Sequence, residues 1–434
     1  MLRSNHSDSN PIQVSRRSFL KVTAVAGLSA ASYSHILGAN ERLAIGHIGT
    51  GGRGTSLLRQ TLAQPELAVA ALSDVDRNHL ARAKELAGNA RTHGDFRKIL
   101  DHKEVDAVVV GTPDHWHCPI AQLAVGAGKD VYCEKPLSHN LAEGRQLVLA
   151  ARRYGRIIQV GTQHRTEEQI LEVAELVRSG RIGKVHTVEL WHPSNPYAAV
   201  TPNAPPPEHL DWDTWLGPAP VAPYHPKRCH FNFRFFYDYA GGYLTDNGVH
   251  MINVVSLAMN NDLAGPVSVE GHEEPFPEEN LFACPKKQYV KWTFKKPDFV
   301  MTWSLPGEEG DAPGLGMRFL GETGTLVASF GKHHILRGGK VVEEPKPGTK
   351  TGDVKLARVP GGNLGDWIRA MRSRKPPIND VEIGHRNVSI SHVGNIASRL
   401  ALPIRFDPKT ERFLDNDKAN AMLSRTNRSP WNQV

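Results

Sequence analysis

The fold of this chain is decided by the stretch LAIGHIGTGGRG, which occupies residues 43–54. An apolar run from Leu43 to Ile48 passes directly into a G-x-G-x-x-G pattern, and an apolar helical segment beginning at Leu57 follows it. Glycines between a strand and a helix allow a tight turn and close approach of a pyrophosphate, while the N-terminus of the helix favours the anion. The pattern predicts a dinucleotide-binding turn formed by Gly49, Gly51, Gly52, Arg53 and Gly54.

The next β-rich run, Leu67 to Ser73, ends at an acidic residue. Asp74 lies about 20 residues beyond the last glycine of the turn, where a carboxylate accepts hydrogen bonds from an adenosine ribose. An acid at this position repels a 2′-phosphate, so we predict NAD as the cofactor, although Arg53 and Arg77 keep NADP open. Asp74 also fits a cap for the helix from Asn78 onward, and the two roles are compatible.

A third run, Val105 to Val110, has the continuous apolar character of a central parallel strand buried on both faces. A polar and aromatic loop follows it. Because ligands bind at the carboxyl ends of strands in an open parallel sheet, this loop is predicted to line the nicotinamide half of the site. The alternative is an Asp-capped helix with a packed tryptophan. The residues predicted here to contact the cofactor are Thr112, Pro113, His115, Trp116 and His117.

A lysine follows the next short strand, Asp130 to Cys133. An ammonium group at the carboxyl end of a strand would touch a bound cofactor and a substrate hydroxyl together. The alternatives are that Lys135 caps its own turn or binds only the cofactor ribose. The last run of this pattern, Ile157 to Val160, leads toward Gln163. We therefore add Glu134, Lys135 and Gln163 to the predicted cofactor contacts.

The 434 residues suggest two domains and a tail. Strands and helical stretches alternate from residue 41 to residue 163, which predicts a doubly wound parallel sheet, that is, a Rossmann domain. From residue 164 to residue 405 the pattern indicates an α+β domain, because short β-rich runs between Pro266 and Glu343 predict an open, mostly antiparallel sheet. Residues 406–434 are polar and are expected to wrap the surface.

A proline-rich segment interrupts the second domain, with ten prolines between Pro193 and Pro226. Proline at this density excludes regular structure, and a loop of this length in a compact domain is more often a functional lid than a simple connection. Its aromatic side chains would stack on a sugar-like ring, although at least half of them are expected in the core. They are Trp212, Trp215, Tyr224, Phe231, Phe233 and Phe235.

A helix beginning near Gly241 carries an aspartate and a histidine on one face. Asp246 and His250 are four residues apart, which is the spacing of side chains that meet along a helix. An ordinary surface pair would have the same spacing. The spacing alone therefore does not indicate a functional site, and the pair is interpreted together with the other motifs.

The N-terminal residues 1–40 have the order and composition of a twin-arginine export signal. The sequence SRRSFLK at residues 15–21 is followed by a weakly apolar, small-residue segment from Val22 to Ala31. A disordered basic tail is the alternative, but it does not explain this order. We predict export of the folded protein through the twin-arginine machinery to a periplasmic or other extracytoplasmic location.

Charge and cysteine content argue against several other classes. Of the net charge of +7, residues 1–40 contribute +3, and the remainder is too mild and scattered for nucleic acid. No run of about 20 apolar residues predicts a stable membrane span. The four cysteines form no C-x-x-C pair, and the cluster from His115 to Cys118 lacks a second ligand pair at zinc-like spacing, so we predict no metal.

Taken in order, the glycine turn, Asp74, the Glu-Lys-Pro motif and the Gly-Gly-x-x-x-Asp-x-x-x-His helix resemble the glucose-fructose oxidoreductase and inositol dehydrogenase family, Gfo/Idh/MocA. The resemblance runs from about residue 43 to about residue 408. It implies that Lys135, Asp246 and His250 face the nicotinamide across the domain boundary. It also implies that the open sheet mediates a homo-oligomer. The proline-rich insertion and the export signal depart from the general pattern and mark an exported subgroup.

The chemistry of these residues agrees with that resemblance. Hydride transfer from a secondary alcohol also requires removal of the hydroxyl proton, and His250 is the natural base near neutral pH. Asp246 would orient it or stabilise its imidazolium, and Lys135 would stabilise developing negative charge on the substrate oxygen. We therefore predict an NAD(P)-dependent oxidoreductase acting on a sugar, polyol or related cyclic hydroxyl.

The export signal modifies this prediction, because an exported enzyme has no free nicotinamide pool to draw on. A tightly held cofactor that is restored within each cycle is then expected. Two redox-neutral reactions fit: oxidation of one sugar coupled to reduction of another, and glycoside cleavage through transient oxidation and elimination. A non-catalytic sugar-binding protein is the contrasting class, and the intact lysine, aspartate and histidine argue against it.

Overall fold

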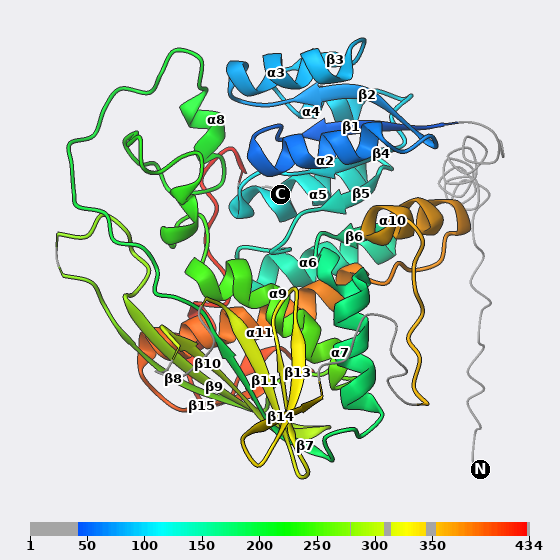
Figure 1. The fold of residues 1–434 in the computed structure, drawn as a ribbon. Coiled ribbons are helices and arrows are strands. Elements are labelled where there is room, and N and C mark those ends of the chain that lie inside the picture. The colour runs from blue at the N-terminus through cyan, green and yellow to red at the C-terminus, as the bar shows by residue number, and fades with distance from the viewer. Residues whose placement is uncertain (1–41, 278, 308–313, 344–352, 432–434) are drawn as a thin grey trace, which may run out of the picture.

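The computed structural model describes residues 42–277, 279–307, 314–343 and 353–431 (Figure 1). The predicted export signal therefore lies outside the described residues. Within the described part of the chain, no helix is both long enough and apolar enough to cross a membrane. The described residues form two sheets, each with its own helices.

The N-terminal sheet, as far as the structure describes it, has six parallel strands in the order β3-β2-β1-β4-β5-β6. This order confirms the predicted doubly wound Rossmann sheet and places its reversal point between β1 and β4, where a ligand crevice forms. The strands are β1 (Leu43–Ile48), β2 (Leu67–Ser73), β3 (Arg91–His93), β4 (Ala107–Val110), β5 (Asp130–Cys133) and β6 (Ile158–Val160). No apolar run announces β3 in the sequence, because its three residues are polar.

Helices cover this parallel sheet, and their ends carry recognisable local signals. In α6 the Asn140 side chain accepts from the N–H of Glu143 at 3.0 Å while the Glu143 carboxylate accepts from the N–H of Asn140, a reciprocal cap. The same helix ends at Gly155, whose φ of 59° suits a left-handed terminus. The helices are α2 (Gly52–Leu62), α3 (Arg77–Ala87), α4 (Arg97–Asp101), α5 (Asp114–Gly126) and α6 (Leu141–Tyr154).

The second sheet has ten strands among the described residues, in the order β14-β13-β12-β11-β7-β10-β9-β8-β15-β16. All neighbouring pairs are antiparallel except β7 with β10, which confirms the predicted mostly antiparallel sheet. The strands are β7 (Val185–Trp191), β8 (Ser268–Glu274), β9 (Lys287–Lys295), β10 (Asp298–Leu305), β11 (Gly316–Gly321), β12 (Thr325–Ala328), β13 (His333–Arg337), β14 (Lys340–Glu343), β15 (Ile404–Asp407) and β16 (Arg412–Phe413).

Two long helices lie between this second sheet and the Rossmann domain (Figure 1). α9 (Gly242–Ala258) and α11 (Val381–Leu400) contact each other, and α11 packs on β8 and β9. The other helices after β6 are η1 (Gln163–Thr166), α7 (Glu168–Arg178), α10 (Gly362–Ser373), which packs on the strands of the Rossmann sheet, and α12 (Asp417–Ala421). Because α9 is almost entirely buried, its polar residues are held in the interior of the molecule.

The segment between β7 and α9, residues 192–241, reaches up to the Rossmann domain, and we call it the lid. It contains α8 (Trp212–Leu216) and the short η2 (Asn232–Phe235). The expectation that proline excludes regular structure throughout was wrong at α8. There the Asp211 carboxylate caps the helix by accepting from the N–H of Thr214 at 3.0 Å.

The C-terminal tail is anchored rather than loosely wrapped around the surface. β15 pairs with β8, so the expected boundary at residue 405 falls inside a strand. Beyond it Phe413, Leu423 and Trp431 are buried. These apolar anchors are about ten residues apart in a polar sequence, too widely spaced to form a periodic pattern.

Candidate active site

Three glycines interlock where β1, β4 and α2 meet. Gly49 has a φ of +82°, and a Cβ built on Gly54 would lie 2.0 Å from the Gly49 carbonyl oxygen. A Cβ on Gly111, just after β4, would lie 3.1 Å from the Cα of Gly54. Any side chain at Gly54 would therefore collide with backbone. The glycine turn is required by packing as well as by any ligand.

Asp74 holds this turn from the end of β2. One of its carboxylate oxygens accepts from the backbone N–H of Thr50 at 2.6 Å and from the Thr50 hydroxyl at 3.1 Å. The other accepts from the N–H of Asp76 at 2.9 Å. The alternative that Asp74 caps the next helix was wrong, because Asp76 is the cap of α3 and accepts from the N–H groups of Asn78 and His79.

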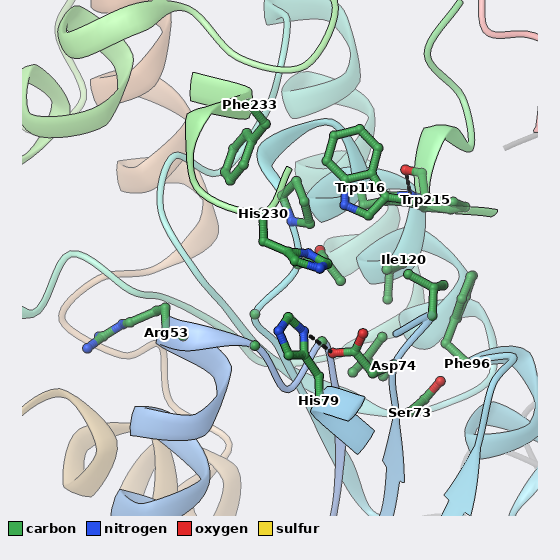
Figure 2. A pocket seen from close by; sticks show the side chains of 18 of the residues that line it. Arg53, Ser73, Asp74, His79, Phe96, Trp116, Ile120, Trp215, His230 and Phe233 are labelled. Carbon is green, nitrogen blue, oxygen red and sulfur yellow. Dashed lines mark hydrogen bonds and ion pairs between the residues drawn. The ribbon is translucent and has the colours of Figure 1, made fainter. Parts of the chain in front are cut away.

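A cavity of about 330 Å³ opens beside the turn at the carboxyl edge of the parallel sheet (Figure 2). We call it the cofactor cavity. Among the predicted cofactor contacts, it is lined by Gly49, Gly51, Gly52, Arg53, Asp74, Thr112, Pro113 and Trp116. Its other side comes from the lid, through Thr214, Trp215, His230, Phe231, Phe233 and Arg234. The Rossmann and C-terminal domains thus enclose it together.

Other lining residues had no signal in the sequence. Phe96 precedes the short helix α4, and Ile120 and His79 lie on the helices α5 and α3. Each looks like an ordinary helix or core residue until the strand order brings it to the cavity. Of the lid aromatics, Trp212 and Phe235 are buried in the lid's own apolar cluster, whereas Phe231 is 66% exposed.

Three residues at the strand ends carry unpaired polar atoms that suit a dinucleotide, and one of them, Thr112, lines the cofactor cavity. The Thr112 hydroxyl, the Thr162 hydroxyl and the side-chain oxygen of Gln163 are buried without a hydrogen-bond partner. A buried polar group without a partner is costly, and the polar groups of a ligand would relieve that cost. With the glycine turn for a pyrophosphate and Asp74 near the expected ribose, these atoms would hold NAD at the strand ends.

Two predicted cofactor contacts on α5 face elsewhere. A ring nitrogen of His115 lies 3.0 Å from the Trp215 carbonyl oxygen, and the two ring nitrogens of His117 lie 2.6 Å and 2.9 Å from the carbonyl oxygens of Pro136 and Thr112. Neither histidine lines the cofactor cavity. They join the strand ends and the lid instead, so their contribution is structural. The thiol of Cys118 likewise donates to a backbone carbonyl, that of Leu137.

Lys135 reaches across the domain boundary to Asp246 on α9. Its ammonium pairs with one carboxylate oxygen and donates to the Asp246 backbone carbonyl at 3.1 Å. The other carboxylate oxygen lies 3.3 Å from Nε of Arg234. Burial opposes ionisation of Asp246, but the two cations outweigh it and hold the pKa of the carboxyl below its usual value. Asp246 is therefore a bridge between two cations.

Glu134 and Arg234 complete this charged cluster. The Glu134 carboxylate accepts from Nε of Arg53 at 2.7 Å, which ties the Glu-Lys-Pro motif to the glycine turn. The Arg234 guanidinium packs over the rings of Phe231 and Phe233, 4.4 Å and 4.7 Å from their centroids. Sequence reasoning missed Arg234, because an arginine in an irregular segment gives no signal of its own.

His250 lies one turn beyond Asp246 but is not bonded to it. Its side chain is buried, and Nδ1 has no hydrogen-bond partner. Burial, followed by the nearby Lys135 ammonium, holds the pKa of His250 well below 6.5. Its ring lies 4.6 Å, centroid to centroid, from that of His164. The surface-pair alternative was wrong, and because both Asp246 oxygens face cations, Asp246 does not orient the His250 ring.

Asp114 is a further charged residue that the sequence did not single out. It is the first residue of α5 and looks like an ordinary helix-start acid. Complete burial raises the pKa of its carboxyl to about 8, although Arg234 and Lys135 lower it. At neutral pH the carboxyl is therefore mostly protonated. The cluster then has three cations, Lys135, Arg234 and Arg53, against the two carboxylates of Asp246 and Glu134, an excess of positive charge.

Comparison with known proteins places these observations in context. Residues 43–162 match the family model described as "Oxidoreductase family, NAD-binding Rossmann fold". Residues 191–301 and 337–433 match "Oxidoreductase family, C-terminal alpha/beta domain". Both models belong to one family, and together they cover more than half of the chain, including the whole parallel sheet and part of the second sheet.

Among curated relatives, inositol 2-dehydrogenase 2 of Saccharopolyspora erythraea is 38% identical over 162 residues, which is 37% of this chain and 48% of the relative. Myo-inositol 2-dehydrogenase of Thermotoga maritima is 30% identical over 146 residues, 34% of this chain and 44% of the relative. The chain thus spans about half the length of the curated relatives it matches.

Solved structures resemble this chain over more of its length than the curated relatives do. A levoglucosan dehydrogenase in complex with NADH and levoglucosan superposes with a TM-score of 0.64 at 16% identity, covering 84% of this chain and 99% of the other. The aldose-aldose oxidoreductase of Caulobacter crescentus, complexed with glycerol, gives 0.63 at 18% identity, covering 84% and 100%. At this identity the likeness is one of fold.

Proposed function

This chain belongs to the Gfo/Idh/MocA oxidoreductase family, with an NAD-binding Rossmann domain, and from that premise we propose that it is an NAD-dependent oxidoreductase acting on a sugar, polyol or related cyclic hydroxyl. The observation that carries the proposal is the contact of Lys135 with Asp246 across the domain boundary, beside the buried imidazole of His250. A cation and a neutral base meet there at the carboxyl edge of the cofactor sheet.

Bound NAD supplies the acceptor for the hydride that leaves the alcohol carbon. The chain's own residues handle the proton and the charge. His250, kept neutral by burial, accepts the hydroxyl proton. Lys135 stabilises the developing negative charge on the substrate oxygen, and Asp246 with Arg234 holds the ammonium in place. The excess positive charge of the cluster also stabilises negative charge on the substrate oxygen.

The cofactor is held tightly, because the lid closes the cavity and is itself fastened to the Rossmann domain. The N–H of Arg77 donates to the His209 carbonyl at 2.9 Å, and the N–H of Asp211 donates to the Val75 carbonyl at 3.0 Å. The indole N–H of Trp116 donates to the Trp215 carbonyl at 3.1 Å. A retained cofactor suits the exported, periplasmic location that we propose from the twin-arginine sequence, with NAD preferred over NADP because of Asp74.

The similar proteins indicate the substrate class. The relatives named above are inositol dehydrogenases, and the similar structures are named for levoglucosan and for aldoses. All of these are cyclic polyols or sugars. With a retained cofactor, oxidation of one sugar coupled to reduction of another is the reaction we favour, carried out by a homo-oligomer.

One experiment separates catalysis from binding. The purified protein is denatured and the released NAD is quantified, and the NAD-loaded protein is assayed against simple sugars and sugar pairs. In Lys135→Ala we expect turnover to fall by about 10²- to 10³-fold, because the charge that stabilises the transition state is removed, while NAD is retained. Lys103→Ala, on an exposed turn, is the matched control. Unchanged turnover in Lys135→Ala would contradict the catalytic role, and absence of NAD would favour a binding protein.

A further inference from the structure

Three imidazoles converge on one carboxylate where the lid meets the Rossmann domain. The carboxylate is that of Asp76, and His79 from α3 and His230 from the lid provide ring nitrogens. One donor atom from each of these three residues lies within 4.8 Å of the others. His209, also from the lid, has Nε2 3.6 Å from an Asp76 oxygen. We propose that this cluster binds a divalent transition-metal ion of the zinc type and thereby fastens the lid over the cofactor cavity.

The helix cap fixes the orientation of the carboxylate. One Asp76 oxygen accepts from the N–H groups of Asn78 and His79 at 2.8 Å and 3.2 Å. The second oxygen faces the lid, 2.9 Å from Nε2 of His230 and 3.6 Å from Nε2 of His209. The side chain of Asp76 is only 3% exposed. The oxygen offered to an ion is therefore preset by the backbone of α3.

The distances suit zinc after small shifts of the imidazole rings. Zinc binds imidazole nitrogen and carboxylate oxygen at about 2.0–2.2 Å, so tetrahedral neighbours lie about 3.4 Å apart. The distances from the Asp76 oxygen to Nε2 of His230 and of His209, 2.9 Å and 3.6 Å, fall on either side of that value. Two or three imidazoles with one carboxylate are a donor set for zinc or a similar transition metal, whereas magnesium and calcium prefer oxygen. His209 or water would complete four ligands.

The position of the cluster determines what a bound ion would do. Asp76 and His79 belong to the Rossmann domain, while His209 and His230 belong to the lid, so one ion would join the two. His79 and His230 also line the cofactor cavity, and their rings lie 4.3 Å apart, centroid to centroid (Figure 2). The backbone of His209 is already bonded to that of Arg77. An ion here would slow the lid motion that releases the cofactor.

A simpler interpretation is a capping aspartate with one histidine hydrogen bond. That interpretation accounts for His230, and Nδ1 of His79 also lies 3.8 Å from an Asp74 oxygen, but neither contact explains why His209 faces the same carboxylate. It also predicts no affinity for a metal. The two interpretations therefore differ in a measurable way that does not require turnover.

The test uses tag-free full-length protein, both NAD-loaded and NAD-stripped, treated with chelator and then dialysed against zinc. We expect one zinc per chain by elemental analysis, and tetrahedral absorption bands when cobalt replaces zinc. Asp76→Asn keeps the helix cap, because asparagine caps equally well, but removes the carboxylate. His230→Gln removes a lid ligand. His186→Gln, on an exposed position of β7, is the matched control.

Each outcome bears on the proposal. Zinc affinity at least about tenfold weaker in Asp76→Asn and His230→Gln, but unchanged in His186→Gln, would support the site. No retained zinc, or equal retention by all three variants, would overturn it. Zinc that binds without slowing NAD release from the wild-type protein would overturn the fastening role, which rests on the proposed function. Zinc binding itself is independent of whether the enzyme turns over, so the two failures are distinguishable.

Discussion

The cofactor cavity has two walls that are built in different ways. The Rossmann wall consists of strand ends and a glycine turn, where backbone atoms and the Asp74 carboxylate are fixed by their neighbours. The C-terminal wall consists of the lid, which presents aromatic rings, His230 and Arg234 to the cavity, and of α9 and the tail behind the lid, where α9 carries Asp246 and His250. The first wall has the features of any dinucleotide site. The second carries what distinguishes this protein.

The difference teaches where specificity and retention arise. Contacts of the Rossmann wall are local in sequence, because each strand end is followed directly by the residues that serve it. Contacts of the C-terminal wall join segments far apart in the chain, such as Trp116 with Trp215 and Trp431. Breaking the first wall should remove the cofactor, whereas breaking the second should change how long it stays and what it does.

The largest effect on NAD binding is expected at Gly54, in the Rossmann wall. In Gly54→Ala the new methyl group would lie 2.0 Å from the Gly49 carbonyl oxygen, and backbone cannot move aside as a side chain would. We expect a cost of about 1–3 kcal/mol, which corresponds to about 5- to 160-fold weaker NAD binding if the whole cost falls on the cofactor site. Calorimetric titration with NAD measures it.

Gly52→Ala is the matched control for folding within the same turn. A Cβ on Gly52 meets nothing within 4 Å, so the thermal unfolding midpoint of the NAD-free variant should equal that of the wild type. If Gly54→Ala bound NAD normally, the interlocked packing of the turn would not be what the cofactor needs.

The second effect concerns the base on the C-terminal wall. His250 must be neutral to accept a proton, and burial with the nearby Lys135 holds its pKa well below 6.5. Turnover should therefore stay level as pH falls through 6.5 and decline only at lower pH, where His250 becomes protonated. A pH profile of kcat/KM, with circular dichroism to show that the protein stays folded, measures this. If the acid limb of the kcat/KM profile were centred at pH 6.5 or above, the base would be a residue other than His250.

The contrast between the walls also explains what the sequence could predict. The alternation of strands and helices and the glycine turn follow from local patterns, and the predicted two-sheet architecture was confirmed. Lys135 and Asp246 were also named from motifs, and the structure brings them together. Arg234 and Asp114 were missed, because an irregular segment and a helix start carry no periodic signal. His115 and His117 were assigned to the cofactor by position, but their rings contact backbone carbonyl groups.

The third effect tests the tail as part of the C-terminal wall. Trp431 packs edge-on against Trp116, 4.7 Å between ring centroids, and Trp116 lines the cavity. Nearby, the Arg428 guanidinium donates to the Gly217 carbonyl at 2.8 Å and so ties the tail to the lid. Truncation of a buried tryptophan costs about 3–5 kcal/mol, part of which falls on the lid. We expect Trp431→Ala to release NAD about tenfold faster, as followed by fluorescence.

Trp431→Phe keeps a ring in the same place and should release NAD at nearly the wild-type rate. If Trp431→Ala released NAD at the wild-type rate, the tail would not contribute to cofactor retention. The C-terminal wall would then consist of the lid and α9 alone.

The smallest effect is expected where the two walls touch, at Asp114. Its carboxyl has a pKa of about 8 because burial outweighs the nearby cations, compared with 3.8 in the unfolded chain. Between these values the folded protein binds the extra proton, so stability falls as pH rises from about 4 to about 8. Asp114→Asn has no such proton. At pH 7 its turnover should stay within about threefold of the wild type, since the native carboxyl is already mostly neutral there.

Denaturant unfolding at pH 5 and pH 9 should show a larger loss of stability at high pH for the wild type than for Asp114→Asn. Equal losses would mean that the carboxyl is already ionised, and that the cluster holds three carboxylates against its three cations rather than an excess of positive charge.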